Sequence, residues 1–202
     1  MIISISTSTN GPCIEKHEVA QVGAAIYKEG EKISQFGSFV RPECIDFSRL
    51  SYVEKMGIRS LSEYRDRAPF LEPFYQVWDR FVSWCLRHSG YDSFKLFCKE
   101  AVWVGYQLDG DLLFLDKEAR LNHKEFRYTD INNKVDINSL CVVMERIARG
   151  KGHHQRVDKD LISLCEFYNV PLKKYEDAAT RAIAIGAVFH YHLAQQKEVY
   201  GL

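Results

Sequence analysis

The first forty residues have the hydrophobic pattern of β-strands. Apolar and β-branched residues run through Met1–Ser6 and Val19–Tyr27, and the turn-forming segment Asn10–Pro12 lies between them. A third stretch, Ile33–Val40, stops just before Pro42, because proline cannot donate a hydrogen bond to a neighbouring strand. The pattern predicts an antiparallel meander of three strands.

Beyond residue 47 the apolar positions recur every three or four residues, which is the period of a helix with one buried face. The clearest stripe follows Pro73 and ends near Ser89-Gly90, where glycine suits a helix C-cap. Its members are Phe74, Val77, Trp78, Phe81, Val82 and Cys85. Further helices are expected at residues 48–56, 62–65, 111–122, 141–149, 160–168 and 176–196. Two further strands are expected at residues 96–104 and 135–140.

Length and composition are typical of one globular α/β domain spanning residues 1–202. Hydrophobic residues make up 46% of the 202, enough for one core of ordinary size. The 27 basic residues equal the 27 acidic ones in number. A protein that coats nucleic acid non-specifically usually carries a large basic excess, so the balance argues against that class but allows a local binding groove.

The cysteines do not suggest a metal site or a disulfide framework. Six are scattered through the chain, with no CxxC pair among them. We interpret them as reduced thiols. No signal peptide and no apolar run of about 20 residues is recognisable, so we expect a cytoplasmic protein without membrane contact.

Several short segments form an ordered series of motifs. They are Ser6-Thr7-Ser8-Thr9-Asn10-Gly11, Ala20–Ala25, Phe39–Pro42, Met56-Gly57-Ile58, Ala68-Pro69-Phe70, Tyr106–Leu115, Asn169-Val170-Pro171-Leu172 and Glu176–Ala182. In order and spacing the series resembles the landmarks of DnaQ-like 3′-to-5′ exonucleases, from the opening Asp-x-Glu-Thr-Thr-Gly to the final His-x-Ala-x-x-Asp-Ala. The resemblance covers nearly the whole chain. It implies an RNase H-like α/β fold with a central mixed five-stranded sheet flanked by helices.

The same resemblance locates an ancestral catalytic site. Members of the family hydrolyse a terminal phosphodiester with two divalent metals held by four acidic side chains. Here those four positions hold Ser6, Ser8, Asp111 and Arg181, and Glu176 stands in place of the general-base histidine. Asp111 is the only acidic residue at these four positions, so the resemblance implies that the catalytic site is not intact.

The replacements predict a site that holds no metal and needs no cofactor. A serine hydroxyl is neutral, and the guanidinium of Arg181 is cationic and repels a nearby metal ion. We expect Arg181 to pair with Asp111, with Glu176 as a second partner. A shifted register would place Asp177 in the last acidic position, but both acids of the first strand would still be absent.

These observations favour a catalytically inactive protein that binds single-stranded nucleic acid or a protein partner. Two alternatives stay open: an active exonuclease with a rearranged metal site, and a purely structural or regulatory interaction module. A homodimer also stays open.

The candidate nucleic-acid contacts are basic residues and one aromatic residue. They are Lys151, His153, His154 and Arg156 in the loop 149–156, Lys173 and Lys174 before the last helix, and Tyr106. Trp103 and Tyr175 are further aromatic candidates for stacking on a base.

Overall fold

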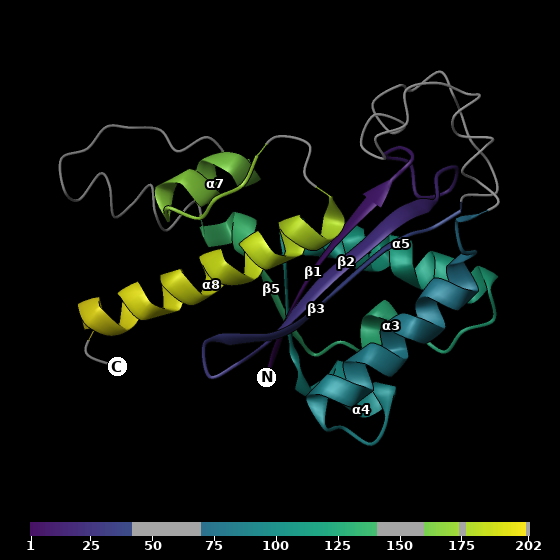
Figure 1. The fold of residues 1–202 in the computed structure, drawn as a ribbon, viewed down its shortest axis with the longest axis horizontal. Helices are drawn as coiled ribbons and strands as arrows, with labels where there is room; N and C mark the ends of the chain where they lie inside the picture. The colour runs from purple at the N-terminus through teal and green to yellow at the C-terminus, as the bar shows by residue number, and fades with distance from the viewer. Residues whose placement is uncertain (42–69, 141–159, 174–176, 201–202) are drawn as a thin grey trace.

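A computed structural model describes residues 1–41, 70–140, 160–173 and 177–200 of the chain. Its centre is a mixed sheet of five strands in the order β3-β2-β1-β4-β5 (Figure 1). The strands are β1 (Ile2–Thr9), β2 (Val19–Lys28), β3 (Glu31–Phe39), β4 (Val102–Gly105) and β5 (Asn133–Asp136). The first three pair antiparallel, whereas β4 runs parallel to β1 and β5 parallel to β4. The predicted meander and the mixed five-stranded sheet are confirmed.

Helices cover the two faces of this sheet. They are α3 (Phe74–Ser89), α4 (Phe94–Glu100), α5 (Leu108–Leu121), α7 (Leu161–Phe167) and α8 (Ala178–Tyr200), with short 3₁₀ turns η2 (Tyr128–Asp130) and η3 (Ile137–Ser139). In Figure 1, α7 and α8 lie on one side of the strands and α3, α4 and α5 on the other. No helix in the described ranges has the length and apolar character needed to span a bilayer.

Two boundaries predicted from the sequence are wrong. The stretch expected as one strand over residues 96–104 is a helix followed by a strand, because Ser93 caps α4 by accepting a hydrogen bond from the backbone N–H of Leu96. The stretch 135–140 is strand only as far as Asp136, whose carboxylate caps the turn η3. The helices expected at 48–56, 62–65 and 141–149 lie outside the described residues.

Alternation along β1 separates two cores. Ile3 and Ile5 belong to the larger apolar cluster, which α3 and α5 complete. The opposite face of the strand carries the buried serines Ser4, Ser6 and Ser8. A second cluster, which includes Val104, Ile137 and Leu164, forms around α7 and α8. The face of β1 under α8 is therefore small and polar near the tip of the strand.

Small residues let α8 approach the sheet closely at its first turn. A Cβ atom at Gly23 would lie 2.0 Å from the carbonyl carbon of Ala178, and one at Gly37 would lie 2.8 Å from the Cβ of Ala179. No side chain fits in such gaps without moving the backbone. The glycine of the second motif therefore fixes where the N-terminus of α8 meets β2.

Candidate functional site

The site lies at the tip of β1, where the strand loses one neighbour. The shorter β4 pairs with β1 only over Ile2–Ser4. At Thr7, the edge of β1 that faces away from β2 therefore has no strand partner in the described part of the chain. Side chains take over the hydrogen bonds of Thr7 instead. Its backbone N–H donates to Oδ1 of Asp111 at 3.2 Å, and its carbonyl oxygen accepts from Nη2 of Arg181 at 2.8 Å.

Arg181 also joins the two serines of the first motif. Its Nε donates to Oγ of Ser6 at 3.1 Å, and its Nη2 donates to Oγ of Ser8 at 2.8 Å. Residues two apart on a strand face the same way, which is why one guanidinium reaches both hydroxyls. The structure thus brings together Ser6, Ser8 and Arg181, as the overlay on the exonuclease motifs predicted.

Asp111, in the first turn of α5, completes the group from the other side of β1. Besides the Thr7 N–H, it accepts the Thr7 hydroxyl at an Oγ1 to Oδ1 distance of 2.5 Å. Burial raises the pKa of Asp111 from 3.8 to about 7, against the opposing effects of the Thr7 hydrogen bonds and the Arg181 charge. Asp136 adds to the rise in pKa by like-charge repulsion.

The predicted direct pair between Arg181 and Asp111 is wrong. Among the ion pairs of the described residues, none joins Arg181 to Asp111. Each of the two side chains hydrogen-bonds Thr7 instead. The backbone N–H and C=O of Thr7 lie between the two side chains and hydrogen-bond one each, so Asp111 and Arg181 do not pair directly. The two charges still interact: burial lowers the pKa of Arg181, and the Asp111 carboxylate partly opposes this shift.

Two residues that the sequence did not single out hold Asp111 in place. Gln107 precedes α5 in a left-handed conformation with φ of 58°, which is uncommon for a residue other than glycine. The Asp136 carboxylate at the end of β5 accepts the backbone N–H groups of Gln107 at 3.1 Å and Leu108 at 3.2 Å. An aspartate at the end of a strand does not by itself indicate this role in the sequence. The role of Asp136 becomes clear only because the N-terminus of α5 lies next to it in the structure.

Gln21 and Asp177 position Arg181 in a comparable way. Oε1 of the buried Gln21 accepts from Oγ of Ser8 at 3.3 Å and from the backbone N–H of Ala178 at 3.0 Å. Asp177 caps α8 by accepting the N–H of Thr180 at 2.7 Å. Since Arg181 rather than Asp177 contacts β1, the shifted register with Asp177 as a ligand finds no support.

The residues at this site do not fit the two divalent metals of an exonuclease. Magnesium and manganese need several anionic oxygens, and Asp111 alone supplies a carboxylate among Ser6, Ser8, Asp111 and Arg181. Across the described ranges, no three histidine, cysteine or acidic side chains cluster as a metal site would require. Glu176 lies outside those ranges.

The proposed nucleic-acid contacts are only partly described. Tyr106 is half-buried at the end of β4 and packs against the second apolar cluster, and Lys173 is exposed. The other candidates, Lys151, His153, His154, Arg156 and Lys174, lie outside the described residues, as does Tyr175. Trp103 is fully buried in the core, so its suggested role in stacking on a base is wrong.

Comparisons with known proteins show the fold of this chain. No protein-family model and no curated protein matches the sequence. Among solved structures, the nuclease domain of 3′hExo, a DEDDh family member, bound to rAMP is 12% identical with a TM-score of 0.65, over 96% of this chain and 90% of that one.

Two further structures are similarly related. A 3′-exonuclease recognising the histone mRNA stem-loop is 14% identical with a TM-score of 0.66, over 96% of this chain. E. coli exonuclease I in complex with a dT13 oligonucleotide is 15% identical with a TM-score of 0.70, over 99% of this chain. This chain spans 63% of the first protein and 42% of the second. It has the DnaQ-like exonuclease fold that the motifs predicted.

Proposed function

We propose that this chain is an exonuclease-fold protein that binds single-stranded nucleic acid without hydrolysing it. The observation that carries the proposal is the position of the Arg181 guanidinium, which donates to Ser6 and Ser8 where the fold's enzymes need metal-binding carboxylates. The site is therefore built around a cation that belongs to the chain itself.

Electrostatics argue against metal-dependent hydrolysis here. Two unit charges about 4 Å apart interact by about 4 kcal/mol at an effective dielectric of about 20, so a dication beside Arg181 would be repelled by roughly 8 kcal/mol. Asp111 offsets part of this repulsion, but it is a single carboxylate where two divalent metals need several. Without metals the fold loses the groups that stabilise the attacking and leaving oxygens.

The choice of nucleic acid as ligand rests on the fold and on basic residues singled out in the sequence. One structural neighbour is described as recognising a histone mRNA stem-loop, and another is in complex with a dT13 oligonucleotide. Lys173 is exposed shortly before α8, and the basic loop 149–156 is proposed as a second contact. Because the net charge is zero, binding must depend on a few phosphate contacts and should be moderate and sensitive to salt.

The test combines a metal titration with two assays on one labelled oligonucleotide. Isothermal titration calorimetry with magnesium or manganese should show no saturable binding at millimolar concentration. A 5′-labelled single strand should stay at full length after long incubation with either metal. Its fluorescence anisotropy should rise with protein concentration, and the affinity should fall steeply between low and moderate salt.

Other results would point elsewhere. Progressive shortening of the strand, abolished by EDTA, would establish an active exonuclease and refute the proposal. Absence of any anisotropy change would leave a protein partner as the ligand class. An affinity that does not change with salt would remove the basic contacts proposed from the sequence.

A further inference from the structure

A small hollow lies at the start of α8, beside the residues here called the Arg181 group, which are Arg181, its hydrogen-bond partners Ser6, Thr7 and Ser8, and Asp111. Strand pairing aligns Ser8 with Gln21 and Gln21 with Phe39, so these three residues form one row across β1, β2 and β3. Two residues along on the same face, Gly23 pairs with Gly37, and the first turn of α8 packs against these two glycines. A cavity of about 150 Å³ lies between the first turn of α8 and the Gln21 and Phe39 end of the row that begins at Ser8. Its lining includes Gln21, Ser38, Phe39, Asp177, Ala178 and Ala179.

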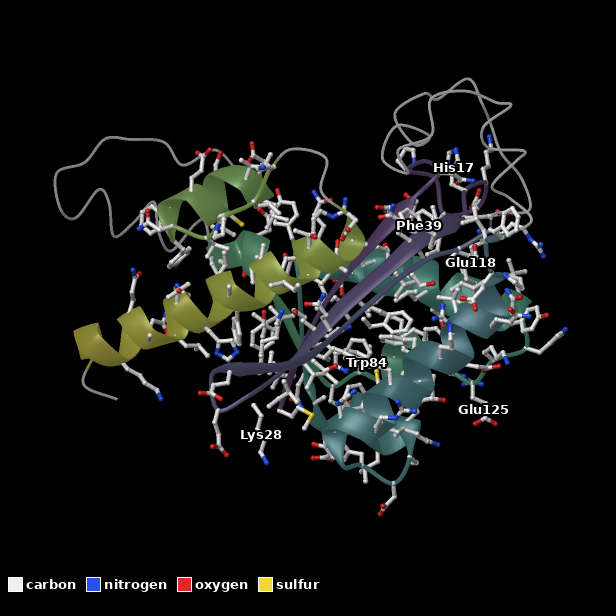
Figure 2. All side chains as sticks on the ribbon, in the orientation of Figure 1. His17, Lys28, Phe39, Trp84, Glu118 and Glu125 are labelled. Carbon is white, nitrogen blue, oxygen red and sulfur yellow. The ribbon has the colours of Figure 1, made fainter. Side chains whose placement is uncertain are left out.

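Phe39 gives this hollow an exposed aromatic wall. Its side chain is 39% exposed at the end of the edge strand β3, near the tip of the sheet where Figure 2 labels it. The other phenylalanine of β3, Phe36, is buried in the larger core. An aromatic ring left accessible beside a cavity can stack on the face of a base, which contributes affinity with little dependence on sequence.

The polar part of the hollow includes the carboxylate of Asp177. Asp177 is exposed, and its carboxylate offers acceptor positions beyond the Thr180 N–H that it caps. A carboxylate recognises the amino group of cytosine, whereas thymine and uracil would present a carbonyl oxygen to it. A cavity of about 150 Å³ is of the size that holds benzene, so the hollow suits a single ring.

The hollow is physically tied to the Arg181 group. Oε1 of Gln21 bonds both Ser8, which binds the guanidinium, and Ala178, which lines the hollow. Asp177 precedes Arg181 by one helical turn, about 6 Å along the axis at about 1.5 Å per residue. A nucleotide can therefore reach the hollow with its base while its backbone lies over the Arg181 group.

From these features we propose that the hollow between Phe39 and Asp177 is a nucleobase subsite that prefers cytosine in a single strand. The proposal rests on the function proposed above, since it names which part of a bound strand the chain recognises. Phe39 stacks on the ring, and Asp177 accepts the exocyclic amino group. Recognition of this kind needs no hydrolysis and no metal.

The experiment measures fluorescence anisotropy with labelled oligodeoxycytidylate and oligothymidylate of equal length. The wild-type chain should bind the cytosine strand several-fold more tightly. Phe39→Ala should weaken binding of the cytosine strand by about fivefold to a hundredfold, the range seen when a stacking side chain is truncated. Phe167→Ala, which removes a ring that is 45% exposed on α7, is the matched control and should bind like wild type.

Asp177→Asn separates recognition from folding. Asparagine caps a helix about as well as aspartate, so α8 should form normally, which circular dichroism and thermal melting would check. The amide can donate to a thymine carbonyl, so the preference for cytosine should vanish or reverse.

Two results would overturn the subsite, and they are distinguishable. If the wild-type chain binds neither strand, the proposed function fails and the subsite fails with it. If the chain binds both strands equally, and Phe39→Ala and Asp177→Asn bind like wild type, nucleic-acid binding stands and only the subsite is wrong.

Discussion

Asp111 and Arg181 hold opposite ends of one residue, because Asp111 accepts the backbone N–H of Thr7 while Arg181 donates to its carbonyl oxygen. The two side chains come from α5 and α8, on opposite faces of the sheet. They replace the neighbouring strand that β1 lacks beyond Ser4. The two side chains thereby satisfy the hydrogen bonds of the strand tip, a task that needs no metal.

Removing the guanidinium should destabilise the fold. Arg181→Met leaves the Thr7 carbonyl and the buried Ser6 and Ser8 hydroxyls without their donor, and each lost partner of this kind costs about 1–3 kcal/mol. We expect the free energy of unfolding in urea to fall by at least about 2 kcal/mol. Arg120→Met is the control. It removes an ion pair with Asp116 in which the arginine side chain is 67% exposed, and it should change stability by less than about 1 kcal/mol. Equal effects of the two substitutions would mean that the Arg181 contacts contribute nothing.

Asp111 should make stability depend on pH in a defined direction. Its folded pKa of about 7 lies above its ordinary value of 3.8, so between these values the folded state binds more protons than the unfolded state. Its contribution to stability is therefore full below about pH 4 and falls as pH rises toward about 7. Asp111→Asn cannot titrate and should lack this slope. The measurement is the difference in unfolding free energy between wild type and the variant from acidic to neutral pH. A constant difference would contradict the raised pKa.

The close approach of α8 to β2 makes Gly23 hard to replace. Gly23→Ala would place a methyl group 2.0 Å from the Ala178 backbone, so α8 must shift and its contacts with β1 must weaken. We expect a loss of about 1–3 kcal/mol or more in thermal or urea unfolding. Gly110→Ala provides the contrast. No described atom lies within 4 Å of the added methyl, and alanine is the better helix former by about 1 kcal/mol, so this change should stabilise.

Restoring the family's residues tests the overlay of the motifs as a whole. Ser6→Asp, Ser8→Glu, Glu176→His and Arg181→Asp together should create a magnesium or manganese site with the native Asp111. Each single reversion should fail, since an incomplete set adds uncompensated charge instead of a site. Calorimetry measures metal binding, and the labelled-strand assay reports weak nuclease activity gained through the introduced general base. A folded quadruple variant that binds neither metal at millimolar concentration would show that the overlay is misplaced.

Local patterns in the sequence were enough to predict most of the sheet and the long helices. The apolar and β-branched runs of Ile2–Thr9 and Val19–Lys28 match strands that are buried on both faces, and the helical stripe of α3 matches burial on one face. The ordered motifs also predicted that Ser6, Ser8 and Arg181 converge. Where a short apolar run fits either helix or strand, as at Phe94–Glu100, the local signal was ambiguous and the strand prediction was wrong.

The fine structure of the site depended on contacts between segments far apart in the chain. No pattern around Thr7 shows that β4 stops short of it, so the sequence predicted a direct pair between Asp111 and Arg181 where the tertiary structure places Thr7 between them. The roles of Gln21 and Asp136 likewise follow from which helix N-terminus each one meets. The sequence by itself determined which residue types are present and which faces are buried. Only the tertiary structure decided which donors meet which acceptors, because hydrogen bonds depend on distances of a few tenths of an ångström that no linear spacing contains.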